Sequence, residues 1–474
     1  MSEIKFGTDG WRAVISEDFT YENVAVVGQA VADFINSRKE PVYKKKKVVV
    51  GYDTRFLSDK YAEIISCVLA ANGIKVVLTD RPSPTPAVGV FIRDNKLTGG
   101  IMITASHNPP QYNGIKYKGY FAGSAGSDII DDIEKRLYKT KVKKTGIDEA
   151  IRKKMISLEN IVSLQIDDIK KFADMKILKK AKLRVLVDSM FGTGGTYLAE
   201  ILKGSSIQLD FMHTDSNPGF HGMAPEPNEK HLKELMSGVK KGKYDLGIAT
   251  DGDSDRLGVV DEKGNILSGH KVMALLFLHL YKNRKMRGGV VQTICGTGLI
   301  ARMAEDFGLE VYETPVGFKY ICDTMIQKDI LVGGEETGGI GFKGYIPERD
   351  GFLSALLIME LIISEKMPVS RIVAELTKKY GSYVYEREDI VFDGSRRKKL
   401  VDGIKKNPLR AVLDKPVVKI NDSDGTKFIC EDGSWLLLRL SGTEPKLRVY
   451  SETGSKKESL KYIEFGKKYA FGLM

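Results

Sequence analysis

Short apolar runs alternate with longer amphipathic stretches through most of the chain. Residues 47–51 and 74–78 are apolar, and between them hydrophobic residues recur at helical spacing from about 59 to 72, with Gly73 as a stop signal. A strand, a helix and a second strand in this order predict a parallel pair of strands with a helix packed on it. The pattern therefore predicts an α/β protein.

The alternation restarts twice further along the chain. Beyond about residue 380 the pattern changes, because two apolar runs follow each other without an intervening helix and indicate paired strands. We expect three similar α/β units with mixed, mainly parallel sheets and a smaller α+β C-terminal domain. Other runs predicted as strands are 100–104, 183–188, 245–250, 289–293, 310–313, 330–333, 435–440 and 447–450, and a further helix is predicted around 300–307. The domains are predicted at 1–145, 156–262, 263–375 and 380–474, with linkers near 139–155 and 364–382.

Composition agrees with a multidomain globular protein. A chain of 474 residues is too long for one ordinary core, and 42% hydrophobic with 28% charged residues is typical of globular proteins. The longest apolar runs, 272–281 and 352–363, are too short or too interrupted to span a bilayer, and the N-terminus has no signal-peptide core. The four cysteines form no CxxC pair. We expect buried thiols in a cytoplasmic protein that has no membrane segment.

The net charge of +11 is compatible with nucleic acid, an acidic membrane surface or an anionic small molecule as partner. The basic runs 44–47, 179–180 and 396–399 lack the interleaved aromatic residues of a nucleic-acid track. We therefore predict solvated loops there and no nucleic-acid partner. An anionic substrate remains open.

The clearest chemistry lies in the acidic loop after the strand 245–250. Asp251, Asp253 and Asp255 alternate with small residues, so three carboxylates can converge on one hard cation such as Mg²⁺. An EF-hand is the alternative, but Arg256 stands where its turn needs glycine, and the flanking residues have the pattern of strands. Arg256 beside a metal site suggests a phosphate contact.

The loop after the strand 100–104 carries a second set of reactive groups. Ser106 and His107 are adjacent, and Lys116 follows ten residues after the serine. A hydrolase nucleophile would need the Gly-x-Ser-x-Gly elbow, which is absent. The alternative is a strand-terminating turn in which the serine caps a helix and the histidine bonds locally.

Two more loops follow predicted strands. Glu335 and Thr337, in the glycine-rich segment 333–339, combine a carboxylate with a hydroxyl, as sugar recognition requires; the alternative is an exposed turn. The loop 439–448 combines hydroxyls, backbone amides and arginines, which suits a phosphate-binding loop; the alternative is a basic hairpin. Its candidate ligands are Arg439, Ser441, Gly442, Thr443 and Arg448.

Taken together, these loops resemble the motifs of the α-D-phosphohexomutase superfamily, the phosphoglucomutase and phosphomannomutase enzymes. The matching segments, in family order, are FGTDGWR (6–12), GYDTR (51–55), TASHNP (104–109), DGDSDR (251–256), GEETG (334–338) and RLSGTEP (439–445). The resemblance implies four domains around a central cleft.

The resemblance also implies roles for the candidate residues. Ser106 would carry the transferable phosphate and bind Mg²⁺ together with the three aspartates. Arg12 and Lys116 would assist proton transfer and stabilise charge, and His107 would contact the phosphoserine. Gly317 and Lys319 lie in a segment that resembles the Gly-aromatic-Lys loop of phosphoglucomutases. Glu335 and Thr337 would hold sugar hydroxyls, and the loop 439–448 the distal phosphate.

The implied activity is interconversion of hexose 1-phosphate and 6-phosphate through a bisphosphate intermediate. Glu336 and Gly339 differ from the methionine or glutamine and the histidine of mannose and glucosamine enzymes, which favours glucose. We expect a phosphoglucomutase, a monomer or homodimer, with glucose 1,6-bisphosphate as intermediate. Mannose phosphates are the alternative, and glucosamine phosphates a less favoured one.

Overall fold

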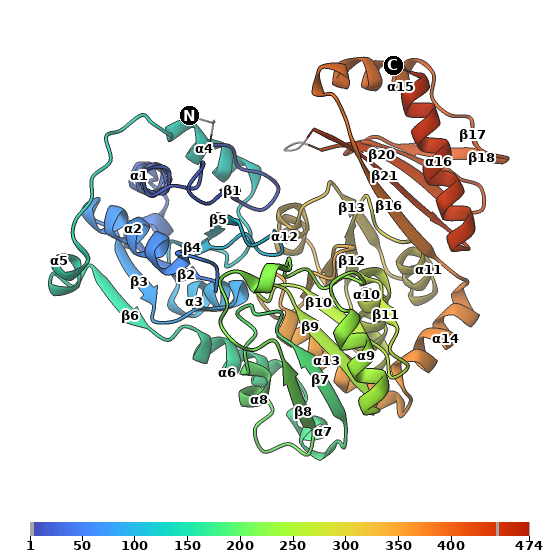
Figure 1. The fold of residues 1–474 in the computed structure, drawn as a ribbon, viewed down its shortest axis with the longest axis horizontal. Coiled ribbons are helices and arrows are strands. Elements are labelled where there is room, and N and C mark those ends of the chain that lie inside the picture. Colours follow the sequence, from blue (N-terminus) through green and yellow to red (C-terminus); the bar gives the residue numbers. More distant parts are fainter. Residues whose placement is uncertain (1–3, 442–444, 474) are drawn as a thin grey trace. The chain divides into compact units, whose positions relative to one another are not determined.

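The computed structural model describes residues 4–441 and 445–473 (Figure 1). The chain divides into two compact units. The first extends to Gly288 and includes Phe318–Ile372, and the second contains Gly289–Gly317 and the chain from Val373 onward. Each unit is described separately below.

The first unit begins with a mixed six-stranded sheet in the order β1-β5-β4-β2-β3-β6. Strands β4, β2, β3 and β6 are parallel, whereas β5 is antiparallel to both β4 and β1. The strands are β1 (Trp11–Val14), β2 (Lys47–Tyr52), β3 (Lys75–Thr79), β4 (Gly99–Ile103), β5 (Tyr112–Gly119) and β6 (Ile156–Glu159). Because β6 pairs with β3, this sheet extends into residues that the sequence pattern assigned to the following domain.

Helices bury both faces of the central strands. Val48, Val49 and Val50 in β2 are all fully buried, which explains why the strand is continuously apolar instead of alternating. The predicted helix is α2 (Ser58–Ala71). Its C-cap residue, Asn72, stands immediately before Gly73 (φ +79°). The other helices are α1 (Tyr21–Ser37), α3 (Thr85–Asn95) and α4 (Ser127–Arg136).

The second sheet of this unit has the order β11-β10-β9-β7-β8. Strands β7 (Arg184–Asp188), β8 (Gln208–Met212) and β9 (Leu246–Thr250) are parallel, whereas β10 (Leu257–Val260) and β11 (Ile266–Leu267) continue it in antiparallel pairs. The acidic loop therefore connects two adjacent strands, β9 and β10, and the EF-hand alternative is excluded. Helices α6 (Val162–Phe172), α7 (Met175–Lys180), α8 (Tyr197–Ile201) and α9 (Lys233–Gly242) accompany this sheet.

The rest of the first unit contains an antiparallel pair, β14 (Ile330–Gly334) and β15 (Ile340–Phe342). Helix α13 (Gly351–Glu365) is buried on nearly all sides, and Asp350 caps it by accepting a hydrogen bond from the Leu353 amide. Helices α10 (Gly269–Leu278) and α12 (Phe318–Gln327) complete this part.

The second unit combines a parallel pair, β12 (Gly289–Thr293) and β13 (Val311–Thr314), with an antiparallel C-terminal sheet. That sheet has the order β16-β21-β20-β19-β18-β17, and every pair in it is antiparallel. Tyr462 and Ile463 of helix α16 (Lys456–Gly472) share a core with Leu436 and Leu438. The strands are β16 (Val384–Val391), β17 (Ala411–Val412), β18 (Lys415–Asn421), β19 (Thr426–Cys430), β20 (Trp435–Leu440) and β21 (Lys446–Thr453). The α+β expectation for this domain is confirmed.

Both predicted linkers contain helices, and the boundary between the two compact units, at Ile372 and Val373, falls within the second. Helix α5 (Ile147–Arg152) lies within 139–155, and α14 (Val369–Tyr380) fills most of 364–382. In α14 the residues Val369, Ile372 and Leu376 are buried at helical spacing, a pattern that the surrounding lysines obscure.

The four cysteines are free and buried, as expected. Among the residues that the structure describes, no helix is both long and apolar enough to cross a bilayer.

Truncating one central strand tests the first sheet. Ile101 in β4 is fully buried, so Ile101→Ala is expected to lower the free energy of unfolding by about 2–5 kcal/mol through lost burial and a residual cavity. Leu158, in β6 of the same sheet, is 57% exposed, and Leu158→Ala should change stability by no more than about 0.5 kcal/mol. Urea unfolding followed by circular dichroism measures both; equal shifts would contradict the sheet described here.

Candidate active site

The candidate serine lies in the turn that connects β4 to β5. Ser106 has a left-handed backbone (φ +53°) and is almost completely buried. Its amide donates to the Thr104 hydroxyl at 2.8 Å. Non-glycine residues rarely adopt this backbone region, and such conformations gather at functional sites.

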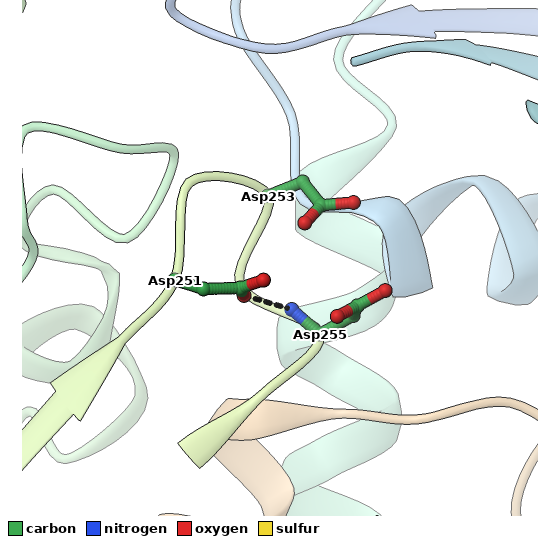
Figure 2. A group of neighbouring side chains, drawn as sticks. All are labelled: Asp251, Asp253 and Asp255. Atoms are coloured by element: carbon green, nitrogen blue, oxygen red, sulfur yellow. Dashed lines mark hydrogen bonds between the residues drawn. The ribbon is translucent and has the colours of Figure 1, made fainter. Parts of the chain in front are cut away.

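The acidic loop brings its three carboxylates together, as the alternation of small and acidic residues predicts. One oxygen from each of Asp251, Asp253 and Asp255 lies within 4.8 Å of the others, and all three residues are fully buried (Figure 2). The Asp251 carboxylate fixes the turn by accepting hydrogen bonds from the amides of Asp255 and Arg256. The side chain of Asp251 therefore stabilises the backbone conformation of the loop.

This cluster fits a divalent cation. The Oδ1 atoms of Asp253 and Asp255 are buried and accept no hydrogen bond from any residue that the structure describes. Burial, and then the charges of Asp255 and Asp253, raise the pKa of Asp251 well above its usual value. A hard cation such as Mg²⁺ would use the free oxygens and relieve this repulsion.

The serine and the acidic loop meet directly. The Ser106 hydroxyl donates to Asp251 Oδ2 at 2.8 Å, and a Cβ added to Gly252 would lie 2.5 Å from the Ser106 carbonyl oxygen. Only glycine therefore allows the two loops to pack this closely. A group carried on the Ser106 oxygen would lie beside the carboxylate cluster.

Lys116 reaches the same cluster, because β5 runs antiparallel to β4 and pairs it with Met102. Its Nζ lies 2.8 Å from Asp253 Oδ2, 3.1 Å from Asp255 Oδ2 and 2.9 Å from Asp9 Oδ2. Burial lowers the pKa of Lys116, but the carboxylates of Asp253, Asp255 and Asp9 outweigh it, so the pKa is raised and the ammonium form is held. Asp253 shifts in the opposite direction. Burial raises its pKa, but the charge of Lys116 and its hydrogen bond outweigh burial, so the pKa lies below its usual value.

The other two predicted catalytic residues contact the serine turn or lie within it. Arg12 in β1 donates to the Asn108 side chain at 2.6 Å. The His107 Nδ1 atom lies 3.3 Å from the Ser106 hydroxyl oxygen. Burial, reinforced by the positive charges of Arg256, Arg12 and Lys116, lowers the pKa of His107 well below its usual value. The imidazole is therefore neutral at physiological pH.

The predicted sugar-binding segment follows β14 and adjoins the acidic loop. Arg256 and Gly339 form a bridge between the two segments, and the Leu257 amide donates to the Gly338 carbonyl at 3.0 Å. Burial raises the pKa of Glu335 to about 7. The Thr337 hydroxyl is buried and has no hydrogen-bond partner among the described residues. The Thr337 hydroxyl is thus available to a ligand, whereas Glu335 Oε2 accepts a hydrogen bond from Arg349 at 3.2 Å.

Arg349 and Asp9 complete the site, and neither was predicted from the sequence as a functional residue. The Arg349 guanidinium lies 2.7 Å from Asp9, 2.8 Å from Asp255 and 3.2 Å from Glu335, so it joins the acidic loop to the sugar segment. Asp9 lies within the FGTDGWR segment, which provided a signal. Arg349 stands directly before the capping residue of α13 and gave none.

The predicted phosphate-binding loop belongs to the second unit. Arg439 and Arg448 occupy directly opposed positions on β20 and β21, and like charges so placed are unfavourable unless anions neutralise them. Asp424 lies 2.8 Å from Arg439, and Asp389 lies 3.6 Å from Arg448. The Ser441 carbonyl accepts a hydrogen bond from Arg397. Gly442 and Thr443 lie outside the described residues.

The last two predicted ligands lie at the start of α12. Gly317 has φ +130°, a conformation that favours glycine, and it belongs to the second unit. Lys319, in the first unit, places its ammonium 5.1 Å from the Tyr320 ring centroid. Within the described residues of the first unit, Lys319 has no contact with the acidic loop or the serine turn.

Comparison with known families matches four successive parts of the chain. Residues 3–144, 165–264 and 268–380 match phosphoglucomutase/phosphomannomutase alpha/beta/alpha domains I, II and III, and residues 394–464 match the C-terminal domain of the same family.

Individual relatives are similar over almost their whole length. A phosphoglucomutase/phosphomannomutase of Thermococcus kodakarensis is 31% identical over 472 residues, 97% of each chain. A phosphoglucosamine mutase of Nautilia profundicola is 30% identical over 98% of each chain. A crystal structure of a Thermus thermophilus protein named for phosphomannomutase activity superposes with a TM-score of 0.86 at 31% identity, covering 99% of this chain and 100% of that one.

Titration with Mg²⁺ tests the carboxylate cluster. Asp253→Asn removes one negative ligand, so we expect its Mg²⁺ affinity to fall by at least about tenfold, a loss typical even of groups that merely support a ligand. Isothermal titration calorimetry measures this without requiring turnover. The control is Asp59→Asn, whose side chain is 56% exposed. Equal affinities in both variants would contradict the proposed metal site.

Proposed function

The chain belongs to the phosphoglucomutase/phosphomannomutase family and is a phosphohexomutase, and we propose that it interconverts glucose 1-phosphate and glucose 6-phosphate. The observation that carries the proposal is the 2.8 Å hydrogen bond between the Ser106 hydroxyl and Asp251, at a buried carboxylate cluster faced by Lys116. It supports a phosphoserine as the group-transfer intermediate, because it holds the serine oxygen beside a cluster that fits a cation able to neutralise a phosphoryl group.

In the proposed reaction the phosphoryl group on Ser106 passes to the free hydroxyl of a hexose monophosphate. The bond from phosphorus to the serine oxygen breaks, a bond to the sugar oxygen forms, and the hydroxyl proton ends on the serine oxygen. The product, glucose 1,6-bisphosphate, then returns its other phosphoryl group to Ser106 by the reverse steps. Substrate and product therefore differ only in which oxygen keeps the phosphate.

The chain's own residues supply positioning and charge, on which phosphoryl transfer mainly depends. The Lys116 ammonium stabilises negative charge and relays the proton, and Arg12 and Arg256 contact phosphate oxygens. Neutral His107 donates or accepts a hydrogen bond at the phosphoserine. Mg²⁺, held by Asp251, Asp253, Asp255 and the phosphoserine, would neutralise charge on the transferred group.

Substrate binding is assigned to the remaining candidates. Glu335 and Thr337 hold sugar hydroxyls, supported by the buried Thr337 hydroxyl, which has no hydrogen-bond partner among the described residues, and Gly317 and Lys319 contact the sugar phosphate. The distal phosphate binds to the loop of Arg439, Ser441, Gly442, Thr443 and Arg448, supported by the opposed arginines. We also propose a cytoplasmic location and a monomer or homodimer.

Glucosamine phosphates are the second candidate substrates, and mannose phosphates the third. The Nautilia profundicola relative carries the name phosphoglucosamine mutase. One carboxylate oxygen of Glu336 is buried without a hydrogen-bond partner among the described residues, and an ammonium group on C2 of the sugar would suit it. Glucose stays preferred because Gly339 replaces the histidine typical of glucosamine enzymes.

Replacing the serine tests the phosphoryl carrier. Ser106→Ala should lower kcat by at least about 10³-fold, since no other group can accept the phosphoryl group. Intact-mass spectrometry after incubation with glucose 1,6-bisphosphate should show an added phosphate on the wild type and none on the variant. Equal activity of both proteins would rule out the phosphoserine mechanism.

A panel of substrates tests the sugar. We expect kcat/KM for glucose 1-phosphate to exceed that for mannose and glucosamine 1-phosphates by about tenfold or more, the discrimination available from one hydrogen-bonded group. Coupled assays in Mg²⁺ with a trace of the matching bisphosphate measure all three. Glu336→Gln removes the carboxylate that would suit an ammonium group on C2, so the relative rate with glucosamine 1-phosphate should fall. A higher kcat/KM for glucosamine 1-phosphate in the wild type would replace glucose with the second candidate.

A further inference from the structure

The GYDTR segment at residues 51–55 has no role in the scheme above, although it lies directly behind the serine turn. Arg55 is its last residue, and its side chain is completely buried. Nη2 donates to the carbonyls of Ser106 and Asn108, both at 2.6 Å. Nη1 donates to the carbonyls of Pro109 and Tyr112, at 2.8 and 3.0 Å. One guanidinium thus holds four carbonyls of a single turn, including that of Ser106.

This contact set requires arginine. A guanidinium carries five N–H donors in a rigid planar fork, and here four serve the turn while Nε lies 3.2 Å from Asp53 Oδ2. A lysine ammonium has three donors at one point and cannot reach four carbonyls spread over seven residues. Because the turn and Asp53 occupy all its nitrogens, Arg55 has no donor left for substrate.

Asp53 acts on the same turn from the other side. Its Oδ2 accepts a hydrogen bond from the Thr104 hydroxyl at 2.6 Å, and that hydroxyl accepts one from the Ser106 amide at 2.8 Å. The amide and the carbonyl of Ser106 are therefore both fixed by one segment, 53–55. This double restraint holds the serine in its left-handed conformation.

The segment between β8 and α9 packs against the Arg55 guanidinium through Phe220. The Phe220 ring centroid lies 4.9 Å from the Arg55 Cζ atom, and Phe220 is fully buried. The Thr54 hydroxyl donates to the Phe191 carbonyl at 2.9 Å. Stacking on a desolvated aromatic face stabilises a cation and limits its rotation.

We propose that Arg55 is a positioning residue for phosphoryl transfer: by binding the carbonyls of Ser106, Asn108, Pro109 and Tyr112, and stacking on Phe220, it aims the serine oxygen at the metal site. The inference rests on the proposed function, since it assumes that Ser106 carries the phosphoryl group. Misplacing a reacting atom by about 1 Å costs on the order of 10²-fold in rate.

The test uses the full-length protein and the variants Arg55→Met, Arg55→Lys and Arg284→Met. Arg284 is the matched control: its Cζ lies 5.0 Å from the Phe172 ring centroid, and it donates to the Phe172 carbonyl and pairs with Glu360. It has no contact with the serine turn among the described residues. Unfolding midpoints measure the structural cost of each variant.

We expect Arg55→Met to lower kcat by about 100-fold with KM for glucose 1-phosphate changed by less than about threefold, and Arg55→Lys to recover only part of the loss. Arg284→Met should keep wild-type kcat even where it loses as much stability. Single-turnover phosphorylation of Ser106 by glucose 1,6-bisphosphate, followed by intact mass, should slow in parallel with kcat. A kcat within twofold of wild type in Arg55→Met, or equal losses in Arg284→Met, would overturn the proposal.

Two milder variants cover the case in which Arg55→Met does not fold. Phe220→Leu removes the aromatic face, and Thr104→Val removes the hydroxyl that binds the Ser106 amide; each should lower kcat by about tenfold at nearly constant KM. Wild-type rates in both would contradict the positioning role. Failure of the underlying function has a different signature, because wild-type Ser106 would then never acquire phosphate, whatever happens at residue 55.

Discussion

Burial of three carboxylates in one short loop is the constraint on which the site depends. Removing an ionised group from water costs several kcal/mol even after relaxation, so Asp251, Asp253 and Asp255 need positive charge close by. Lys116 and Arg349 supply it from β5 and from the turn before α13. The charge requirement therefore binds the serine turn, the acidic loop and the sugar segment into one arrangement.

The same arrangement explains how a serine without a strong base beside it can take part in catalysis. His107 is kept neutral by burial and by surrounding cations, and Lys116 is kept protonated by carboxylates. A protonated lysine cannot accept the serine proton, and a histidine with a lowered pKa is a weak base. Both conditions suit a serine that carries a phosphoryl group, because the surrounding charges then balance the anion and the left-handed turn fixes its direction.

Local sequence patterns predicted helices and strands well where burial alone determined the positions of the apolar residues. Strands such as β2 are apolar throughout because both faces are covered, and α2 has helical spacing with a glycine after its end. Prediction failed where composition hid the pattern, as in α14, whose apolar residues stand among lysines. It also failed for β6. This four-residue strand pairs with β3, which is distant in the sequence, and such a pairing leaves no pattern within the strand itself.

The sequence determined which chemical groups are available: a spaced set of carboxylates, a serine before a proline-stopped turn, a lysine ten residues later and two arginines near the C-terminus. Short spacing confines such groups to one loop, so Asp251, Asp253 and Asp255 could be predicted to converge. Tertiary structure decided their partners. Arg349 meets Asp9 across 340 residues of sequence, and Arg55 meets the Ser106 carbonyl across 51. Such contacts arise from the order and direction of strands in a sheet, which depend on the whole core and leave no local pattern.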